Sequence, residues 1–382
     1  MQRILRRLVT LAALGLAALG PGPLTSVRAA DAIARQPLAI NFGDFTTKAE
    51  LTYPMAGGRR PSLILIPQLV PEDLDGILTG QAGRSPSTHN FADIANYLSP
   101  RGIAVLRYNQ HYVTSTRQID GRDFTTKMDL PQMLRDAEKV LAAAQANPHV
   151  DPKRIFVYGW GEGSTVAAAL AVRHSSLAGL VVQSGTALPW HQLLRDQVVG
   201  VGLPYLRRFA PDGRVTAATL RRAQLGGGGA VAQSIVIYFA APKAIAGMPA
   251  LNQDLDTNHD GAIDIASEFL PQLDREIDSF LSPGGIFHAY GPKRTLPTLN
   301  AQAFRLSLPV LILQGENDST VPASSARSLD KALPAKSKHV LRLYPGLGST
   351  LGPAPSRIGD TLNPIARAPL NDLAAWLSQH AH

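Results

Sequence analysis

Six short apolar runs, set among segments with helical spacing, constrain the fold of this chain more than any other feature. The runs cover residues 62–67, 103–108, 155–160, 179–184, 310–314 and 340–344. Segments 91–98, 130–146, 164–174 and 369–380 carry apolar residues at helical spacing. Nearly continuous apolar runs are typical of strands buried on both faces of a parallel sheet with crossover helices. The sequence therefore predicts an α/β fold with a mostly parallel sheet and helices on both faces.

The stretch 187–299 breaks this alternation. It contains three helix-like segments, 193–209, 216–239 and 269–281, and it lies between two predicted strands. We interpret it as a helical cap inserted into the sheet domain. The chain then divides into a targeting segment (1–29), a first core part (30–186), the cap (187–299) and a second core part (300–382).

The first 29 residues have the pattern of a secretory signal peptide. Arg3, Arg6 and Arg7 precede an apolar run over 8–19, which is too short to span a bilayer. The small side chains of 27–29 then favour cleavage after Ala29. This pattern predicts an exported protein, periplasmic or secreted, with no membrane contact after cleavage. A membrane anchor is the alternative interpretation.

Charge and cysteine content limit the possible functions. The formal net charge of +8 falls to +4 without residues 1–29, because these hold four arginines and no acidic residue. No basic block with interleaved aromatic residues is present, so nucleic-acid binding has little support. The chain has no cysteine, which excludes disulfides and thiolate catalysis.

One glycine-rich turn carries the clearest functional signal. Gly159-Trp160-Gly161-Glu162-Gly163 follows a predicted strand and opens a predicted helix. A GxSxG nucleophile elbow requires this same strand–turn–helix context. The middle position is occupied by Gly161, which tolerates a strained backbone but has no oxygen that could attack an acyl carbon.

With this turn, the chain resembles the α/β-hydrolase superfamily over about residues 49–376. The resemblance is to exported bacterial hydrolases related to serine aminopeptidases and dienelactone-hydrolase-like esterases. In the family, the elbow serine is followed by an acid and then a histidine. The resemblance implies Asp318 as the acid, because residues 315–322 read GENDSTVP directly after a strand. It places Ser349, in the final turn 345–352, where the histidine belongs.

Two further turns depart from the family pattern. The resemblance implies that the backbone N–H groups of Gln68 and Glu162 form the oxyanion hole, but the turn 68–76 lacks the usual glycines. The turn 108–114 also lacks the usual charges and glycines. Four departures in one expected site, on an otherwise preserved scaffold, favour lost catalysis over a misaligned motif.

Other side chains could in principle replace the missing groups. We expect Ser164 to cap the first turn of its helix and Ser319 to bond local backbone. His111 is the best substitute base, since its turn lies near the site in relatives, but a satisfied histidine is the favoured interpretation. His339 begins a strand and His380 lies near the chain end, so neither is favoured.

The predicted cap also contains a sequence with the pattern of a calcium loop. Residues 256–264 match the first nine positions of an EF-hand loop, with glycine at the sixth. The ligands would be side-chain oxygens and one backbone carbonyl, from Asp256, Asn258, Asp260, Ala262 and Asp264. Ser267 stands at the twelfth position, and the expected acid follows one residue later as Glu268. We predict a structural calcium ion here, with a solvated acidic turn as the alternative.

These observations leave three functional hypotheses. The first is an exported, non-catalytic pseudoenzyme that binds a small molecule or a protein in the inherited pocket. The second is an active hydrolase of esters, lactones or peptides that uses unorthodox residues. The third is a cell-surface interaction protein that uses the cap and the calcium loop. No cofactor for catalysis is expected. Because site chemistry decides function within a fold, the first hypothesis is favoured.

Overall fold

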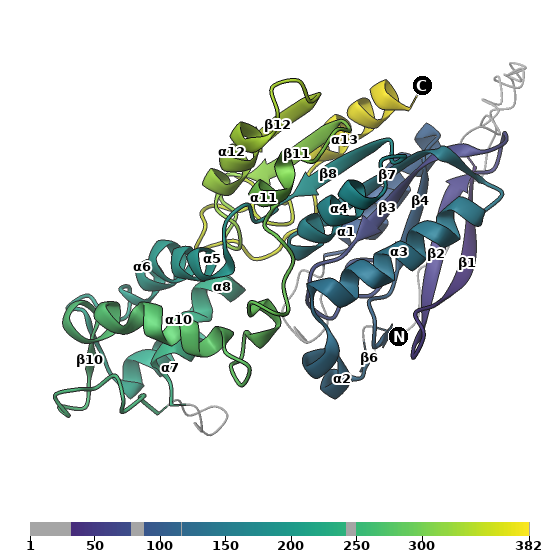
Figure 1. The fold of residues 1–382 in the computed structure, drawn as a ribbon. Coiled ribbons are helices and arrows are strands. Elements are labelled where there is room, and N and C mark those ends of the chain that lie inside the picture. The colour runs from purple at the N-terminus through teal and green to yellow at the C-terminus, as the bar shows by residue number, and fades with distance from the viewer. Residues whose placement is uncertain (1–31, 78–87, 116, 242–249, 382) are drawn as a thin grey trace, which may run out of the picture.

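The computed structural model describes residues 32–77, 88–115, 117–241 and 250–381 (Figure 1). The predicted signal peptide lies outside these residues. An eight-stranded sheet forms the centre of the fold, in the order β1-β2-β4-β3-β7-β8-β11-β12. Its strands are β1 (Ile33–Asn41), β2 (Thr46–Pro54), β3 (Arg60–Ile66), β4 (Ala104–Tyr108), β7 (Val150–Trp160), β8 (Gly179–Gln183), β11 (Val310–Gly315) and β12 (His339–Tyr344).

The sheet confirms the predicted fold class. Strand β2 runs antiparallel to both β1 and β4, and the other neighbouring strands are parallel. The six apolar runs correspond to β3, β4, β7, β8, β11 and β12. The hairpin of β1 and β2 was not predicted, because β1 alternates between exposed and partly buried residues and carries no continuous apolar run. Such alternation is typical of an antiparallel edge with one face in water.

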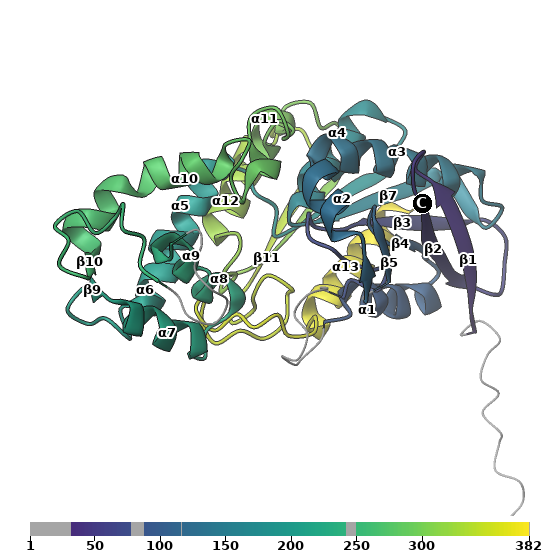
Figure 2. The same cartoon turned by 90° about the horizontal axis from the view of Figure 1, so that it is seen from below.

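Helices cover both faces of the sheet, as predicted (Figures 1 and 2). Residues of α3, α4, α11 and α12 share one buried cluster with the strands, and residues of α1 and α13 share another. These helices are α1 (Asn90–Leu98), α3 (Leu130–Ala146), α4 (Glu162–Arg173), α11 (Leu299–Ala303), α12 (Ala323–Ala332) and α13 (Arg367–His380). A short helix α2 (Gly121–Lys127) follows the small hairpin of β5 (Val113–Ser115) and β6 (Gln118–Ile119).

Between β8 and β11 the chain forms a largely helical region with a buried apolar cluster of its own. Both views show its helices gathered at one end of the molecule (Figures 1 and 2). Its α-helices are α5 (Trp190–Gln197), α6 (Leu203–Leu206), α7 (Ala217–Leu225), α8 (Ala230–Gln233), α9 (Ile235–Phe239) and α10 (Leu273–Leu281). A two-stranded sheet of β9 (Arg214–Val215) and β10 (Ile263–Asp264) completes it.

The helical segments of this region are more broken than the sequence suggested. The segment 216–239 forms three helices instead of one, and the glycines at 226–229 separate the first of them, α7, from α8. Glycine destabilises a helix interior through its greater backbone entropy. A π-helical turn, η3 (Val198–Gly202), joins α5 to α6. Among the described residues, no helix is both long and apolar enough to cross a membrane.

Candidate functional site

The glycine-rich turn lies between β7 and α4, and its backbone has the strained geometry of an elbow. Gly161 has φ 56° and ψ −122°, a region that residues with a Cβ rarely adopt. Its N–H donates to the carbonyl of Gln183 on β8 at 3.0 Å. A Cβ on Gly163 would collide with the backbone of Ile66, so this second glycine allows α4 to pack closely against β3.

The side chain of Gln68 covers the apex of this turn. A Cβ built on Gly161 would lie 2.9 Å from both Cγ and Oε1 of Gln68. Gln68 Nε2 donates to Oε1 of Glu72 at 2.9 Å, and its backbone carbonyl accepts from Gln110 Nε2 at 2.7 Å. Burial raises the pKa of Glu72 well above its usual value. The carboxamide of Gln68 therefore occupies the space that a nucleophile side chain would need.

The predicted oxyanion turn is occupied by side-chain contacts of Glu162. One carboxylate oxygen of Glu162 accepts from the N–H of Leu69 at 3.3 Å, and the other accepts from the hydroxyl of Tyr290 at 2.9 Å. Burial and the charge of Glu162 both raise the pKa of Tyr290 well above its usual value. Glu162 thus joins the turn after β3 to the chain segment that leads out of the cap.

Asp318 follows β11 at the expected acid position and is fully buried. Its Oδ1 accepts from the N–H groups of Thr320 (2.8 Å) and Val321 (2.9 Å), and its Oδ2 accepts from Gln314 Nε2 (2.9 Å). Burial, followed by the charge of Asp360, raises the pKa of Asp318 to about 7. The acid is therefore held by hydrogen bonds and has a second carboxylate as its charged neighbour.

Ser349 lies close to the turn of Gly161, and both its carbonyl and its N–H group are hydrogen-bonded. Its carbonyl accepts from Trp160 Nε1 (3.0 Å), Gln183 Nε2 (2.8 Å) and Ser184 Oγ (3.0 Å). Its own hydroxyl is buried and has no hydrogen-bond partner among the described residues. An orphaned hydroxyl at a buried position is unusual, because buried polar groups are generally paired.

Asp360 is the residue of this site that the sequence did not indicate. Its Oδ2 accepts from the N–H and Oγ of Ser319 and from the N–H of Ser349, each at 3.0 Å. Its Oδ1 lies against Gly348, where any Cβ would collide with it. Asp360 belongs to a segment without helix or strand between β12 and α13, so no periodic pattern could have revealed it.

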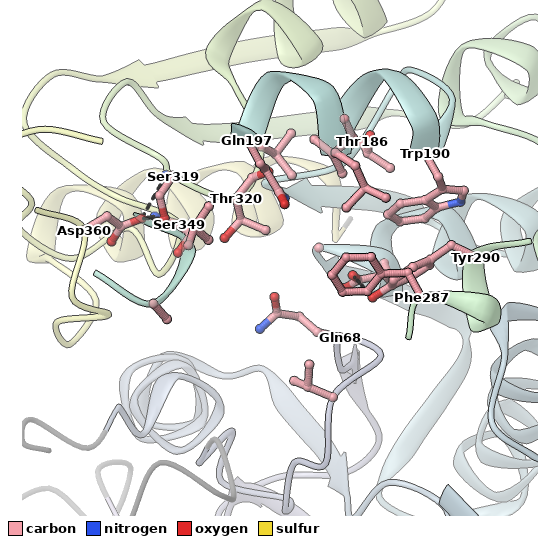
Figure 3. A pocket seen from close by; sticks show the side chains of 18 of the residues that line it. Gln68, Thr186, Trp190, Gln197, Phe287, Tyr290, Ser319, Thr320, Ser349 and Asp360 are labelled. Carbon is pink, nitrogen blue, oxygen red and sulfur yellow. Dashed lines mark hydrogen bonds between the residues drawn. The ribbon is translucent and has the colours of Figure 1, made fainter. Parts of the chain in front are cut away.

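A cavity of about 340 Å³ lies between the sheet domain and the cap (Figure 3). Gly161, Glu162 and Gln68 line it from the core, and Ser349 and Asp360 line it from the segment after β12. Asp318 is not among the described lining residues, although its neighbours Ser319, Thr320 and Val321 are. The cap contributes mainly apolar and aromatic side chains: Trp190, Leu193, Leu194, Val231, Phe287 and Tyr290.

Two serines considered as substitutes make other hydrogen bonds than expected. Ser164 does not cap its helix: its Oγ donates to the carbonyls of Gly159 (2.6 Å) and Gln183 (3.1 Å), and so ties β7 to β8. Ser319 bonds Asp360 rather than local backbone. Both corrections have the same cause, since buried hydroxyls bind the nearest acceptor whichever segment supplies it.

His111 is buried away from the cavity. Its Nδ1 lies 3.0 Å from Asp136 Oδ2, and its Nε2 lies 3.2 Å from Asp44 Oδ1. Its ring also stacks with that of Phe45 at 5.3 Å between centroids. Only Nδ1 is hydrogen-bonded, since the buried Nε2 makes no hydrogen bond among the described residues, and His111 is not one of the described residues that line the cavity.

The EF-hand-like loop folds around its own hydrogen bonds. Asp256 accepts from the N–H groups of Asp260 (3.1 Å) and Gly261 (3.0 Å), and Gly261 has a positive φ of 79°. Glu268 turns into the loop and accepts from the N–H groups of Thr257 (2.9 Å) and Asp264 (2.8 Å). Within the described part of the chain, no three acidic or histidine side chains gather as metal ligands. Calcium binding here stays a prediction.

Comparisons with known proteins agree with this fold. The family model described as alpha/beta hydrolase fold matches residues 76–344. The chain belongs to this family. The esterase EstD of Thermotoga maritima is 28% identical over 149 residues, which make up 39% of this chain and 32% of that esterase. The match thus spans about a third of the length of this curated relative.

Two solved structures share the overall fold. The alpha/beta hydrolase GrgF from Penicillium sp. sh18 has a TM-score of 0.51 at 17% identity, with 91% of this chain and 99% of that chain covered. The hypothetical protein PA2218 from Pseudomonas aeruginosa has a TM-score of 0.51 at 15% identity, with 97% and 100% covered. At these identities the likeness shows the fold alone.

Proposed function

We propose that this chain is a non-catalytic member of the α/β-hydrolase family, which binds a small molecule in the cavity between core and cap. One observation carries the proposal: the carboxamide of Gln68 lies over Gly161, in the space that a nucleophile would occupy. Gln68 is held there by a hydrogen bond from its Nε2 to Glu72. A preserved scaffold with a filled nucleophile position supports binding without turnover.

The chemistry of the surrounding groups supports the same proposal. Acyl transfer needs an oxygen or sulfur nucleophile and a base that takes its proton. The elbow apex is Gly161, and none of the described residues that line the cavity is a histidine. When triad members are removed, the oxyanion hole and substrate binding together give only about 10³–10⁴-fold rate enhancement over water. Glu162 and Gln68 further reduce this, since they fill the turn that would hold an oxyanion.

One contact favours the alternative, an active hydrolase with unorthodox residues. Ser319 lines the cavity, and its Oγ donates to Asp360 Oδ2 at 3.0 Å. This is a hydroxyl paired with a carboxylate. However, the same oxygen already accepts two backbone N–H groups besides the hydroxyl, so it is engaged in holding the local backbone. The non-catalytic proposal is therefore preferred.

A labelling experiment separates the two. The full chain is treated with a fluorophosphonate probe and assayed with short-chain p-nitrophenyl esters, beside its Ser319→Ala variant. We expect that the probe labels no serine. We also expect that the unmodified chain hydrolyses the esters no faster than Ser319→Ala does. Labelling that disappears in Ser319→Ala would refute the non-catalytic proposal and identify Ser319 as the nucleophile.

We also propose that the protein is exported to the periplasm or the cell exterior, on the basis of the charged and apolar pattern of residues 1–29. Expression of the full chain in a bacterial host, with fractionation and N-terminal sequencing, tests this. Mature protein that begins at Ala30 outside the cytoplasm is the expected result. Protein that keeps Met1 in the cytoplasmic fraction would contradict it.

A further inference from the structure

The cavity has carboxylates in its wall and no matching cation. Asp360 and Glu162 both line it, and none of the described lining residues is lysine, arginine or histidine. The nearby guanidinium of Arg357 is already engaged, since it donates to the carbonyl of Asp318 at 2.9 Å and forms an ion pair with Asp196 at 2.5 Å. A buried charge is normally paired, because an uncompensated one is costly in a protein interior. Asp360 has hydrogen bonds but no cationic partner among the described residues.

Two polar atoms near Asp360, its own Oδ1 and the hydroxyl of Ser349, can accept further hydrogen bonds. Three donors converge on Oδ2 of Asp360, whereas none of the hydrogen bonds among the described residues involves Oδ1. The hydroxyl of Ser349 is 98% buried, lines the cavity and has no partner among the described residues. Ser349 and Asp360 are held together, since the Ser349 N–H donates to Asp360. Together they offer acceptors to a donor-rich group.

The opposite end of the cavity is aromatic. Trp190 and Tyr290 stack with ring centroids 4.4 Å apart, and Phe287 lies 6.4 Å from Tyr290. Figure 3 shows Asp360, Ser319 and Ser349 at one end and these three rings at the other, with Gln68 between them. Trp190 is fixed by a hydrogen bond from Nε1 to Thr295 Oγ1 at 2.8 Å. The site therefore combines an acidic head region with a preformed apolar wall.

We propose that this cavity binds a small molecule with a protonated primary amine and an apolar, preferably aromatic, body. The ammonium donates to Asp360 Oδ1 and Ser349 Oγ, and the body packs against Trp190 and Phe287. An ammonium has three donors and no acceptor, so it suits a carboxylate and an orphaned hydroxyl. Charge-assisted hydrogen bonds of this kind are roughly twice as strong as neutral ones. The inference rests on the proposed function, because it treats the cavity as a binding site.

The test uses three ligands that share one body and differ in charge: 4-phenylbutylamine, 4-phenylbutan-1-ol and 4-phenylbutanoate. Titration calorimetry of the full chain measures their dissociation constants at neutral pH. We expect the amine to bind roughly tenfold more tightly than the alcohol, and the carboxylate to bind most weakly. In Asp360→Asn, which keeps an acceptor oxygen for the local N–H groups, the amine should bind no more tightly than the alcohol.

Asp330→Asn is the matched control. Asp330 is a partly exposed aspartate on α12 whose ion-pair partner is His339, at 3.5 Å, and it does not line the cavity. This variant should keep the full amine preference. Ser349→Ala removes a hydroxyl that has no protein partner, so it should fold and lose only part of the preference.

Three results would overturn the inference: no amine binding at millimolar concentration, equal or tighter binding of the alcohol or the carboxylate, or an amine preference that survives in Asp360→Asn. The comparison of ligands on the unmodified chain decides the matter even if Asp360→Asn fails to fold. If the amine shows no preferred binding and the fluorophosphonate probe labels no serine, only the proposed amine preference is refuted. Serine labelling together with an amine preference refutes only the non-catalytic proposal.

Discussion

Replacing Gly161 by alanine tests the central feature of the site, the Gln68 side chain over the elbow. The backbone of Gly161, at φ 56° and ψ −122°, is sparsely populated for a residue with a Cβ. Holding alanine there costs about 1–3 kcal/mol. The new methyl group would also lie 2.9 Å from Cγ and Oε1 of Gln68, and overpacking of this kind costs about 1–3 kcal/mol. Gly161→Ala should therefore lower the free energy of unfolding by about 2–6 kcal/mol.

The two contributions can be separated experimentally. Gly102 also has a positive φ, of 93°, but a Cβ there would meet nothing within 4 Å. Gly102→Ala, at φ 93° and ψ 5°, should thus show the cost of a left-handed backbone position without a new side-chain contact. Gln68→Ala removes the side chain that the new methyl meets, so in the double variant with Gly161→Ala the contact cost should vanish. Denaturant unfolding of the four variants and the unmodified chain gives the coupling free energy, which we expect at about 1–3 kcal/mol.

Additive effects would refute this reasoning. If Gly161→Ala costs no more than Gly102→Ala, and if Gln68→Ala does not relieve it, then the Gln68 carboxamide does not occupy the apex. The non-catalytic proposal would lose its main support, because the space above the elbow would be free for a nucleophile or a substrate. A change in the denaturant slope without a change in midpoint would instead report an altered denatured state.

Three other predictions concern the acid, the triad and the loop. Because the pKa of Asp318 is raised from 3.8 to about 7, the folded state binds more protons than the unfolded state between these values, so stability should fall as pH rises from about 4 to about 7. Melts at several pH values should show this fall in the unmodified chain and a weaker one in Asp318→Asn. Esterase activity should be negligible in Gly161→Ser/Ser349→His and should appear only when Gln68→Ala is added, whereas equal activity of the double and triple variants would contradict the role of Gln68. Calcium should raise the melting temperature by a few degrees over chelator if the loop at Asp256 binds it, and identical midpoints would leave the loop as an acidic turn.

The sheet and the elbow were predictable because their physics is local. Strands buried on both faces need continuous apolar runs, and the close packing of α4 on β3 needs a glycine such as Gly163. Both requirements can be recognised directly in the sequence. The hairpin of β1 and β2 is harder to recognise, since β1 alternates between exposed and more buried residues and neither strand has a continuous apolar run.

The chemistry of the site was less predictable, since it depends on contacts between distant segments. Asp360 reaches Ser319 across 41 positions of sequence, and it comes from a segment with no periodic pattern. The Gln68 side chain, in the turn after β3, lies over Gly161, in the turn after β7. Nothing in the spacing of residues encodes such pairs. The resemblance to the family located the site but not the side chains that fill it.

Asp318 has a different charged neighbour from the acid of a working triad. In a working triad, the buried acid faces a histidine that becomes cationic during the reaction, so the acid has a positive partner. In this chain Ser349 lies near that place, and the charged neighbour of Asp318 is the carboxylate of Asp360. Burial raises the pKa of Asp318, and repulsion between the two buried carboxylates, which have no free cation beside them among the described residues, raises it further. A bound ammonium beside Asp360 would offset that repulsion, so the proposed ligand should lower the pKa of Asp318 and flatten the fall in stability between pH 4 and pH 7. The neutral alcohol, which fills the same apolar wall, should leave that fall unchanged.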